Sequence, residues 1–415
     1  VSADGGTPHV LLQPDAEGDL HYMWPEPLPG GGLLFTILQD NRTSVAVLPR
    51  GATAPRVLVE SGGHALYLGT GHLAYVTDGR LMVAPFDLER LEMRGPAIAL
   101  ADDVYEDRGS TYYDVSSTGV LAYLPRASAT STIVWKDRRG VTRPALPQAR
   151  AYEWLALSRD GERLSVGIQQ GTSRSIWAGS VADQPLTRLT PSSDAWFGLW
   201  SRDGRQLFHT AFVDGSYNVF STATDGSGKT ERLTHSRNWQ AATSESPDGK
   251  TLLFHDINNA GGSGVDIWAL ALASGELRTV VQTPFHEYDA RFSPDGRWIS
   301  YTSEETGQQE VYVQAYPGPG LRRQVSSDGG RASSWSHSGR ELFYQTGSAL
   351  FAVPILQDPT FRTGRPVQLF SLAGTVGEVS VSPDGHRFLV LEARPLAPQL
   401  NLVLNWFDDV RARVK

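Results

Sequence analysis

The sequence predicts an all-β fold, a single closed β-propeller of four-stranded antiparallel blades, and three observations lead to this prediction. A Ser-x-Asp-Gly turn, or a relaxed version of it, recurs seven times at spacings of 42 to 47 residues, which is the period of one propeller blade. The chain contains 42 Gly and 25 Pro, which favour frequent tight turns over long helices. Finally, short runs of strand-forming residues lie at regular distances from each turn.

Each repeated turn has a local physical reason. In Ser293-Pro294-Asp295-Gly296, the proline fixes φ, the aspartate can bond the following backbone and the glycine takes the positive φ that ends the turn. A hairpin between a short innermost strand and a stronger second strand follows from this. The seven copies begin at Ser116, Ser158, Ser201, Ser246, Ser293, Ser336 and Ser382.

Counting the repeats predicts about nine blades, with eight as the alternative. Two degenerate units precede the first clear turn, and the last unit lacks a fourth strand before a short helix expected at 406–414. The orphan strand 9–13 would complete that unit, so the N- and C-terminal strands would close one ring. The expected units are 14–60, 61–104, 105–149, 150–192, 193–236, 237–284, 285–328, 329–373 and a closing unit of 374–405 with 9–13, all within one domain, 1–415.

Composition and charge exclude several classes of function. The formal net charge is −8 with both signs mixed along the chain, so we expect no nucleic-acid partner. The sequence has no cysteine, which excludes disulfides and thiolate chemistry. No apolar stretch reaches the roughly 20 residues of a spanning helix, so we expect no membrane insertion of this chain itself. Because it begins at Val1 and part-way into a repeat, we expect a piece of a longer protein.

The repeat resembles that of TolB-like propellers of bacteria. The residues that carry the resemblance are the Ser-Pro-Asp-Gly turns, strands such as Thr251–Phe254 and the Asp266-Ile-Trp268 segment, and the likeness covers nearly the whole chain. TolB is a periplasmic partner-binding protein. The resemblance therefore implies a binding module in an extracytoplasmic compartment, periplasmic or at the cell surface.

A narrower series of motifs is similar to the C-terminal sensor propeller of bacterial transmembrane Ser/Thr protein kinases. Its segments are Thr283–Phe285, Arg291–Trp298, Glu310–Val313, Tyr316–Gly320, Gly339–Tyr344 and Leu404–Phe407. In such kinases a membrane span separates the cytoplasmic kinase domain from the propeller. No kinase Gly-rich loop, His-Arg-Asp or Asp-Phe-Gly segment occurs in this sequence, so the resemblance implies a WD-repeat-like, non-enzymatic sensor domain, expected to be a monomer without a cofactor.

The best candidates for ligand binding are residues at or just before the starts of innermost strands. In a closed ring these positions gather round one mouth of the central channel, where converging aromatic side chains could hold a protein, peptide or glycan. The alternative is that each packs between blades. The candidates are Tyr112, Tyr152, Trp196, Trp239, Tyr288, His286 and Glu287.

The alternative function is a propeller enzyme, a lyase or hydrolase with a metal or polar site at the channel. His286, Glu287 and Asp289 form the densest polar cluster, and His21, His64, Asp194 and Glu378 could join it. None of the ten histidines has a compact metal-ligand spacing. The aspartates of the repeated turns are expected to serve the turns and not catalysis, because each adjoins Gly in the same local motif.

Overall fold

A computed structural model of the chain describes residues 7, 10–13, 21–39, 42–107, 110–125, 130–170, 173–182, 185–190, 194–257, 264–318, 320–356, 361–393 and 399–415. The chain divides into two compact units, where the sequence led us to expect one ring. Unit 1 comprises Val1–Ser128 with Leu396–Lys415, and unit 2 comprises Ala129–Pro395. Unit 2 is therefore inserted into the sequence of unit 1.

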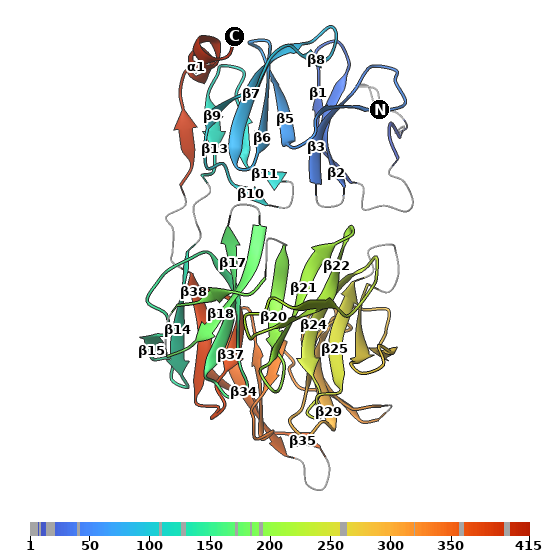
Figure 1. Cartoon of the computed structure of the whole chain (residues 1–415), viewed down its shortest axis with the longest axis vertical. Helices are drawn as coiled ribbons and strands as arrows, with labels where there is room; N and C mark the ends of the chain where they lie inside the picture. The colour runs from blue at the N-terminus through green and yellow to red at the C-terminus, as the bar shows by residue number, and fades with distance from the viewer. Residues whose placement is uncertain are drawn as a thin grey trace. The chain divides into compact units, whose positions relative to one another are not determined.

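Unit 1 consists of antiparallel sheets and one short helix within the described residues (Figure 1). Its larger sheets are ordered β1-β2-β3-β4 and β5-β6-β7, with β8 and β9 both on β7; β10-β11 and β12-β13-β39 complete it. The elements are β1 (His21–Pro27), β2 (Leu33–Gln39), β3 (Arg42–Leu48), β4 (Arg56–Val59), β5 (Gly63–Leu68), β6 (His72–Thr77), β7 (Arg80–Asp87), β8 (Glu92–Met93), β9 (Ile98–Ala101), β10 (Glu106–Asp107), β11 (Ser110–Thr111), β12 (Tyr113–Val115), β13 (Leu121–Tyr123), β39 (Asn401–Val403) and α1 (Trp406–Arg413).

Unit 2 consists of six antiparallel sheets within the described residues, in the orders β15-β14-β38-β37, β16-β17-β18-β19, β20-β21-β22-β23, β24-β25-β26-β27, β28-β29-β30-β31 and β32-β33-β34 with β35 and β36 on β34. The strands of the first three sheets are β14 (Ser131–Asp137), β15 (Thr142–Pro144), β37 (Thr375–Val381), β38 (Arg387–Ala393), β16 (Tyr152–Leu157), β17 (Arg163–Gln170), β18 (Ser173–Ser180), β19 (Thr187–Arg188), β20 (Ala195–Trp200), β21 (Gln206–Val213), β22 (Ser216–Ala223) and β23 (Thr230–Arg232). The strands of the other three are β24 (Trp239–Glu245), β25 (Thr251–Ile257), β26 (Val265–Ala271), β27 (Leu277–Val281), β28 (Glu287–Phe292), β29 (Trp298–Ser303), β30 (Glu310–Ala315), β31 (Arg322–Gln324), β32 (Arg331–Trp335), β33 (Glu341–Gln345), β34 (Ala349–Leu356), β35 (Arg362–Thr363) and β36 (Val367–Ser371).

The six sheets of unit 2 form a ring of blades. The innermost strands contact one another in the cyclic order β37, β16, β20, β24, β28, β32 and back to β37. Apolar cores lie between consecutive blades; one of them joins Ile133 and Leu389 of the first sheet to Tyr152, Leu155 and Leu164 of the next. Because each blade covers the apolar face of its neighbour, the ring leaves few such faces in water.

Two of the expected repeat units are wrong, and so is the expected closure. The segment 105–149 does not form one blade: β12 and β13 pair with each other and with β39 in unit 1, whereas β14 pairs with β38 in unit 2. In Figure 1 the strand β38, from the end of unit 2, lies beside β14, from its start. The expected closing strand 9–13 has no strand structure over 10–13; His9 lies outside the described residues. The other seven expected units each coincide with one sheet.

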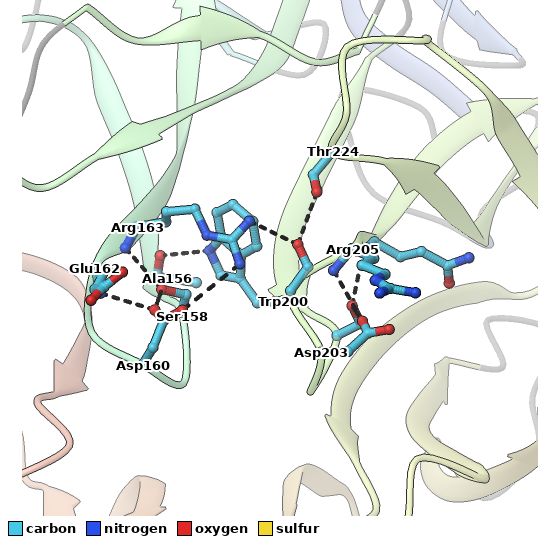
Figure 2. A network of polar contacts seen from close by, with 12 residues as sticks. Ala156, Ser158, Asp160, Glu162, Arg163, Trp200, Asp203, Arg205 and Thr224 are labelled. Atoms are coloured by element: carbon cyan, nitrogen blue, oxygen red, sulfur yellow. Dashed lines mark hydrogen bonds and ion pairs between the residues drawn. The ribbon is translucent and has the colours of Figure 1, made fainter.

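The repeated turns are stabilised by one recurring set of hydrogen bonds (Figure 2). In the first turn of unit 2, the Ser158 hydroxyl donates to Asp160 Oδ1 at 2.5 Å and accepts from the Arg163 N–H at 2.9 Å. Asp160 Oδ1 also accepts from the Glu162 N–H at 3.0 Å. These bonds from Ser158 and Glu162 hold the pKa of the Asp160 carboxyl below its usual range. The prediction that the turn aspartates serve the turns is confirmed for this and the equivalent turns.

The first turn of unit 2 is also linked to the next blade. Arg163 lies over the Trp200 ring at 4.7 Å and donates to the Gly204 carbonyl at 2.9 Å, and Figure 2 shows its guanidinium between the two turns. Trp200 Nε1 donates back to the Ala156 carbonyl at 3.3 Å. These contacts hold the first two turns of unit 2 in position relative to each other.

Three of the six innermost strands of unit 2 carry a β-bulge at the same position relative to the repeated turn. In unit 2 the register shifts between Trp196 and Leu199 in β20, and between the corresponding residues of β28 and β32. The residues inside these shifts, Phe197, Asp289 and Ala332, have φ of 49°, 53° and 49°. A non-glycine residue in this region costs roughly 1 kcal/mol or more. Recurrence at one position indicates that the bulge has a use, which is to direct side chains toward the ring axis.

Among the described residues, α1 is the one helix, and no helix there has the length and apolar character that crossing a bilayer requires.

The buried imidazole of His209 predicts a loss of stability in acid. Its Nε2 lies 2.9 Å from the Thr222 hydroxyl, the residue is 2% exposed, and burial lowers its pKa from 6.5 to about 4. Between these pH values the unfolded chain binds more protons at this site than the folded chain does. We therefore expect the unfolding free energy of unit 2 to fall as pH falls from 6.5 to 4, by on the order of 3 kcal/mol from this group.

Urea unfolding at pH 7.5 and pH 4.5 measures this effect. The variant His209→Gln should lose much less stability between the two conditions than wild type, whereas His235→Gln, at an exposed position, should behave as wild type. Equal acid sensitivity in wild type and His209→Gln would show that His209 is not responsible.

Candidate functional site

The axis of unit 2 contains a cavity of about 540 Å³ that receives residues from all six innermost strands. Its apolar lining includes Leu155, Leu199, Trp200, Phe292 and Trp335. Each innermost strand runs from its bulge to its turn. The cavity therefore has a bulge end, lined by residues near the strand starts, and a turn end, lined by residues at the repeated turns.

At the bulge end, the strained residues of the innermost strands line the cavity. Phe197, Asp289 and Ala332 all contribute to its wall. Burial raises the pKa of the Asp289 carboxyl, while Arg291 and Arg331 act in the opposite direction. The wall at this end therefore includes a phenyl ring from one blade and, from two others, an acidic group that interacts with two guanidinium groups.

At the turn end, the second residue of the turn motif points to the cavity. This position is occupied by Arg159, Arg202, Pro247, Pro294 and His337 in five of the turns, and all five line the cavity. Glu245, the last residue of β24, lines the same region, and its carboxylate accepts the backbone N–H of Arg202. The turn that fixes the hairpin thus also selects which side chain reaches the channel.

The cavity wall carries ionisable groups of both signs. The lining contains the arginines Arg159, Arg202, Arg291 and Arg331, the carboxylates Glu153, Glu245 and Asp289, and the histidines His255 and His337. Glu153 is already ion-paired with Arg174, whose Nε lies 2.7 Å from Glu153 Oε2. Because Glu153 is paired in this way, the arginines outnumber the remaining carboxylates of the wall, which favours an anionic or polar ligand.

The structure brings together two of the aromatic residues expected at the mouth. Phe197 lies between Trp196 and Trp239, with ring centroids 5.9 Å and 6.5 Å away. Trp239 also contacts Tyr217 and His255, each at 6.1 Å. The Arg174 guanidinium lies 3.8 Å from the Trp196 ring centre. These two tryptophans therefore form an aromatic cluster with Phe197 and His255, which line the cavity, but they do not line it themselves.

The remaining expected binding residues are in other surroundings. Tyr112 is exposed and belongs to unit 1, where its ring lies 5.0 Å from that of Tyr105. Tyr152 is 4% exposed and packs in the core between two blades. This is the alternative to ligand binding that the sequence left open. Tyr288 is partly buried, and burial together with Glu304 raises its pKa to about 12.

His286 and Glu287 lie side by side in sequence but differ in exposure. The His286 ring is exposed, and its Nδ1 accepts the Val265 N–H at 3.2 Å. Glu287 is 0% exposed and accepts hydroxyl hydrogen bonds from Thr283 at 2.6 Å and Ser303 at 3.2 Å. Burial raises the pKa of its carboxyl.

The metal cluster considered as an alternative does not assemble among the described side chains. In that part of the chain no three His, Asp or Glu side chains gather as metal ligands. His21 and His64 belong to unit 1, and Asp194 is held by Tyr217, whose hydroxyl donates at 2.5 Å. The side chain of Glu378 lies outside the described residues.

Of the residues that line the channel, sequence reasoning named Asp289 but missed Phe197 and the second residues of the repeated turns. Phe197 follows Trp196, and its approach to the axis depends on the bulge. The sequence does mark three of the turn residues, because proline at the second position of the repeated turn is replaced there by Arg159, Arg202 and His337.

Comparison with known proteins gives partial matches to several bacterial proteins. The chain is 27% identical over 173 residues to the Tol-Pal system protein TolB of Francisella tularensis subsp. tularensis, covering 42% of this chain and 34% of the relative. It is 24% identical over 204 residues to the uncharacterized protein Atu1656 of Agrobacterium fabrum, covering 45% of this chain and 67% of that relative. The chain thus spans about a third of the length of its TolB relatives. No protein-family model matches it.

Among solved structures, the chain is similar to a TolB-type protein from Agrobacterium tumefaciens. The TM-score is 0.53 at 20% identity, with 64% of this chain and 99% of the other covered. The antiparallel blades and their axial cavity define a β-propeller. More particularly, the fold is that of a TolB-like β-propeller.

Proposed function

We propose that this chain is a non-enzymatic propeller that binds a protein partner at the axial cavity of unit 2. The observation that carries the proposal is the cavity itself, which six separate blades line with fixed aromatic and charged side chains. Preformed concave sites of mixed polarity are typical of binding sites. The similarity to TolB proteins of the Tol-Pal system supports partner binding.

The same proposal extends to the cellular setting. We place the chain outside the cytoplasm of a bacterium, in the periplasm or at the cell surface. In the narrower form of the proposal it is the sensor domain of a membrane Ser/Thr kinase, and the support is the set of sequence motifs from Thr283 to Phe407. Partner contact at the cavity would involve Phe197 directly and the neighbouring Trp196, Trp239 and Tyr288.

Site-specific photocrosslinking in cells that make the full-length protein tests the binding site. A benzoylphenylalanine at Phe197 should give a discrete adduct with a partner protein. The control is the same substitution at Leu277, on the outer strand β27, which is 44% exposed. An adduct from Leu277 and none from Phe197 would move the interface to the sides of the blades and refute the cavity proposal.

The aromatic cluster gives a second readout of the same site. We expect Trp196→Ala/Trp239→Ala to reduce the yield of the adduct at position 197 about tenfold, because the two tryptophans contact that side chain and hold it at the cavity wall. Val141→Ala, at a residue that is 55% exposed and does not line the cavity, is the control. An unchanged adduct yield in the double variant would exclude the two tryptophans from the site.

A further inference from the structure

The turn end of the channel holds two guanidinium groups and one imidazole, from three blades, close to one another. Arg159 and Arg202 are the second residues of two consecutive repeated turns. His337 is the second residue of another repeated turn, and all three line the cavity. The His337 imidazole is near enough to Arg159 to interact with its backbone carbonyl. Three groups that can carry positive charge therefore face one cavity.

These groups are incompletely neutralised within the protein. Burial and the neighbouring Arg202 lower the pKa of the Arg159 guanidinium. Burial, Arg159 and Arg202 lower the pKa of the His337 imidazole. Among the described residues, neither Arg159 nor Arg202 has an ion pair, and Glu245 is the carboxylate that interacts with both.

An added anion would relieve this repulsion. A guanidinium presents its N–H donors in a fork that matches the two oxygens of a carboxylate. Charge–charge attraction is also stronger in a partly enclosed cavity than in bulk water. The rigid Pro247 and Pro294 occupy the same position in two other turns and add no donors, so anion recognition is confined to one side of the opening.

The size and the lining of the cavity indicate which kind of ligand carries the anionic group. A volume of about 540 Å³ is too small for a folded domain and suits a short extended segment or a few side chains. Beyond the arginines, the wall combines serine and threonine hydroxyls with apolar side chains, among them Leu157, Trp200 and Trp335. An inorganic anion would use the cations alone, whereas a peptide that carries both carboxylates and apolar side chains would use the whole wall.

We infer that the turn end of the unit 2 channel is a carboxylate-binding site that receives an acidic, partly apolar peptide segment through Arg159, Arg202 and His337. This inference rests on the proposed partner-binding function and names the chemistry of the partner. The remaining cavity wall supplies contacts for apolar residues next to the acidic ones.

Fluorescence anisotropy with the full chain tests the site. The probe is a labelled peptide of about ten residues that alternates glutamate and leucine, and the comparison peptide has glutamine in place of every glutamate. Wild type should bind the glutamate peptide at least about tenfold more tightly than the glutamine peptide. Arg159→Gln/Arg202→Gln should abolish this preference, while Arg205→Gln/Arg340→Gln should keep it. The control arginines lie in repeated turns but do not line the cavity.

A charge reversal guards against a loss of binding caused by misfolding. Arg159→Glu/Arg202→Glu should reject the glutamate peptide and bind a lysine–leucine peptide more tightly than wild type does. Equal binding of the glutamate peptide by wild type and Arg159→Gln/Arg202→Gln would overturn the inference. Complete displacement of the peptide by millimolar phosphate would also overturn it, in favour of a site for a small free anion. Either result would leave a Phe197 crosslink intact, so failure here is distinct from failure of the proposed function.

Discussion

The variant Gly198→Val is expected to destabilise unit 2 by about 3 kcal/mol or more, at the upper end of what overpacking of a core costs. A Cβ atom at Gly198 would lie 2.6 Å from Trp154 Cη2 and 2.9 Å from Leu207 Cδ2. Trp154 cannot move aside, because on its other side a Cβ atom at Gly167 would lie 2.2 Å from its Nε1. The indole is held between two glycines of consecutive blades.

Urea unfolding with hydrogen–deuterium exchange measures this effect, since exchange identifies which strands lose protection. Peptides from β17, β20 and β21 should exchange faster in Gly198→Val. Gly347→Val is the matched control, because its Cβ would have no heavy atom within 4 Å. The double variant Trp154→Leu/Gly198→Val should be more stable than the sum of the single effects. Full stability of Gly198→Val would show that the packing between these blades is looser than the structure indicates.

The variant Trp406→Ala is expected to destabilise unit 1 by about 3–5 kcal/mol, the usual cost of truncating a buried tryptophan. Trp406 is 2% exposed and Val410 is 0% exposed, and both pack in one core with Leu68, Leu81 and Leu121. The C-terminal segment 403–414, with helix α1, therefore supplies apolar groups to a core whose other members come from the first third of the chain. Removing the indole would leave a cavity there.

Calorimetry with hydrogen–deuterium exchange again locates the change. Peptides from β6, β7 and β13 should lose protection in Trp406→Ala. Asp409→Ala, on the exposed side of α1, should change stability by less than about 1 kcal/mol. Wild-type protection of these strands in Trp406→Ala would mean that α1 is dispensable for unit 1.

The local structure could be predicted from the sequence because each repeated turn is specified by adjacent residues. Ser158, Asp160 and Gly161 form their turn through contacts within six positions of the chain. The hairpins that follow such turns, the period of the blades and the terminal helix could therefore be predicted. The candidate site was readable only in part: Trp196 and Trp239 do meet in one cluster, but Phe197 connects them through a bulge that leaves no clear mark in the sequence.

By itself, the sequence determined that this protein is built of antiparallel blades with Ser-x-Asp-Gly turns, because turn and strand preferences depend on neighbouring residues. Only the tertiary structure decided which blades share a ring. Strands 121–123 and 131–137 are close in sequence and similar in pattern, yet one pairs with β39 and the other with β38. Since an alternating apolar strand can pair with any edge that buries the same face, the division into two units depends on the packing of whole sheets.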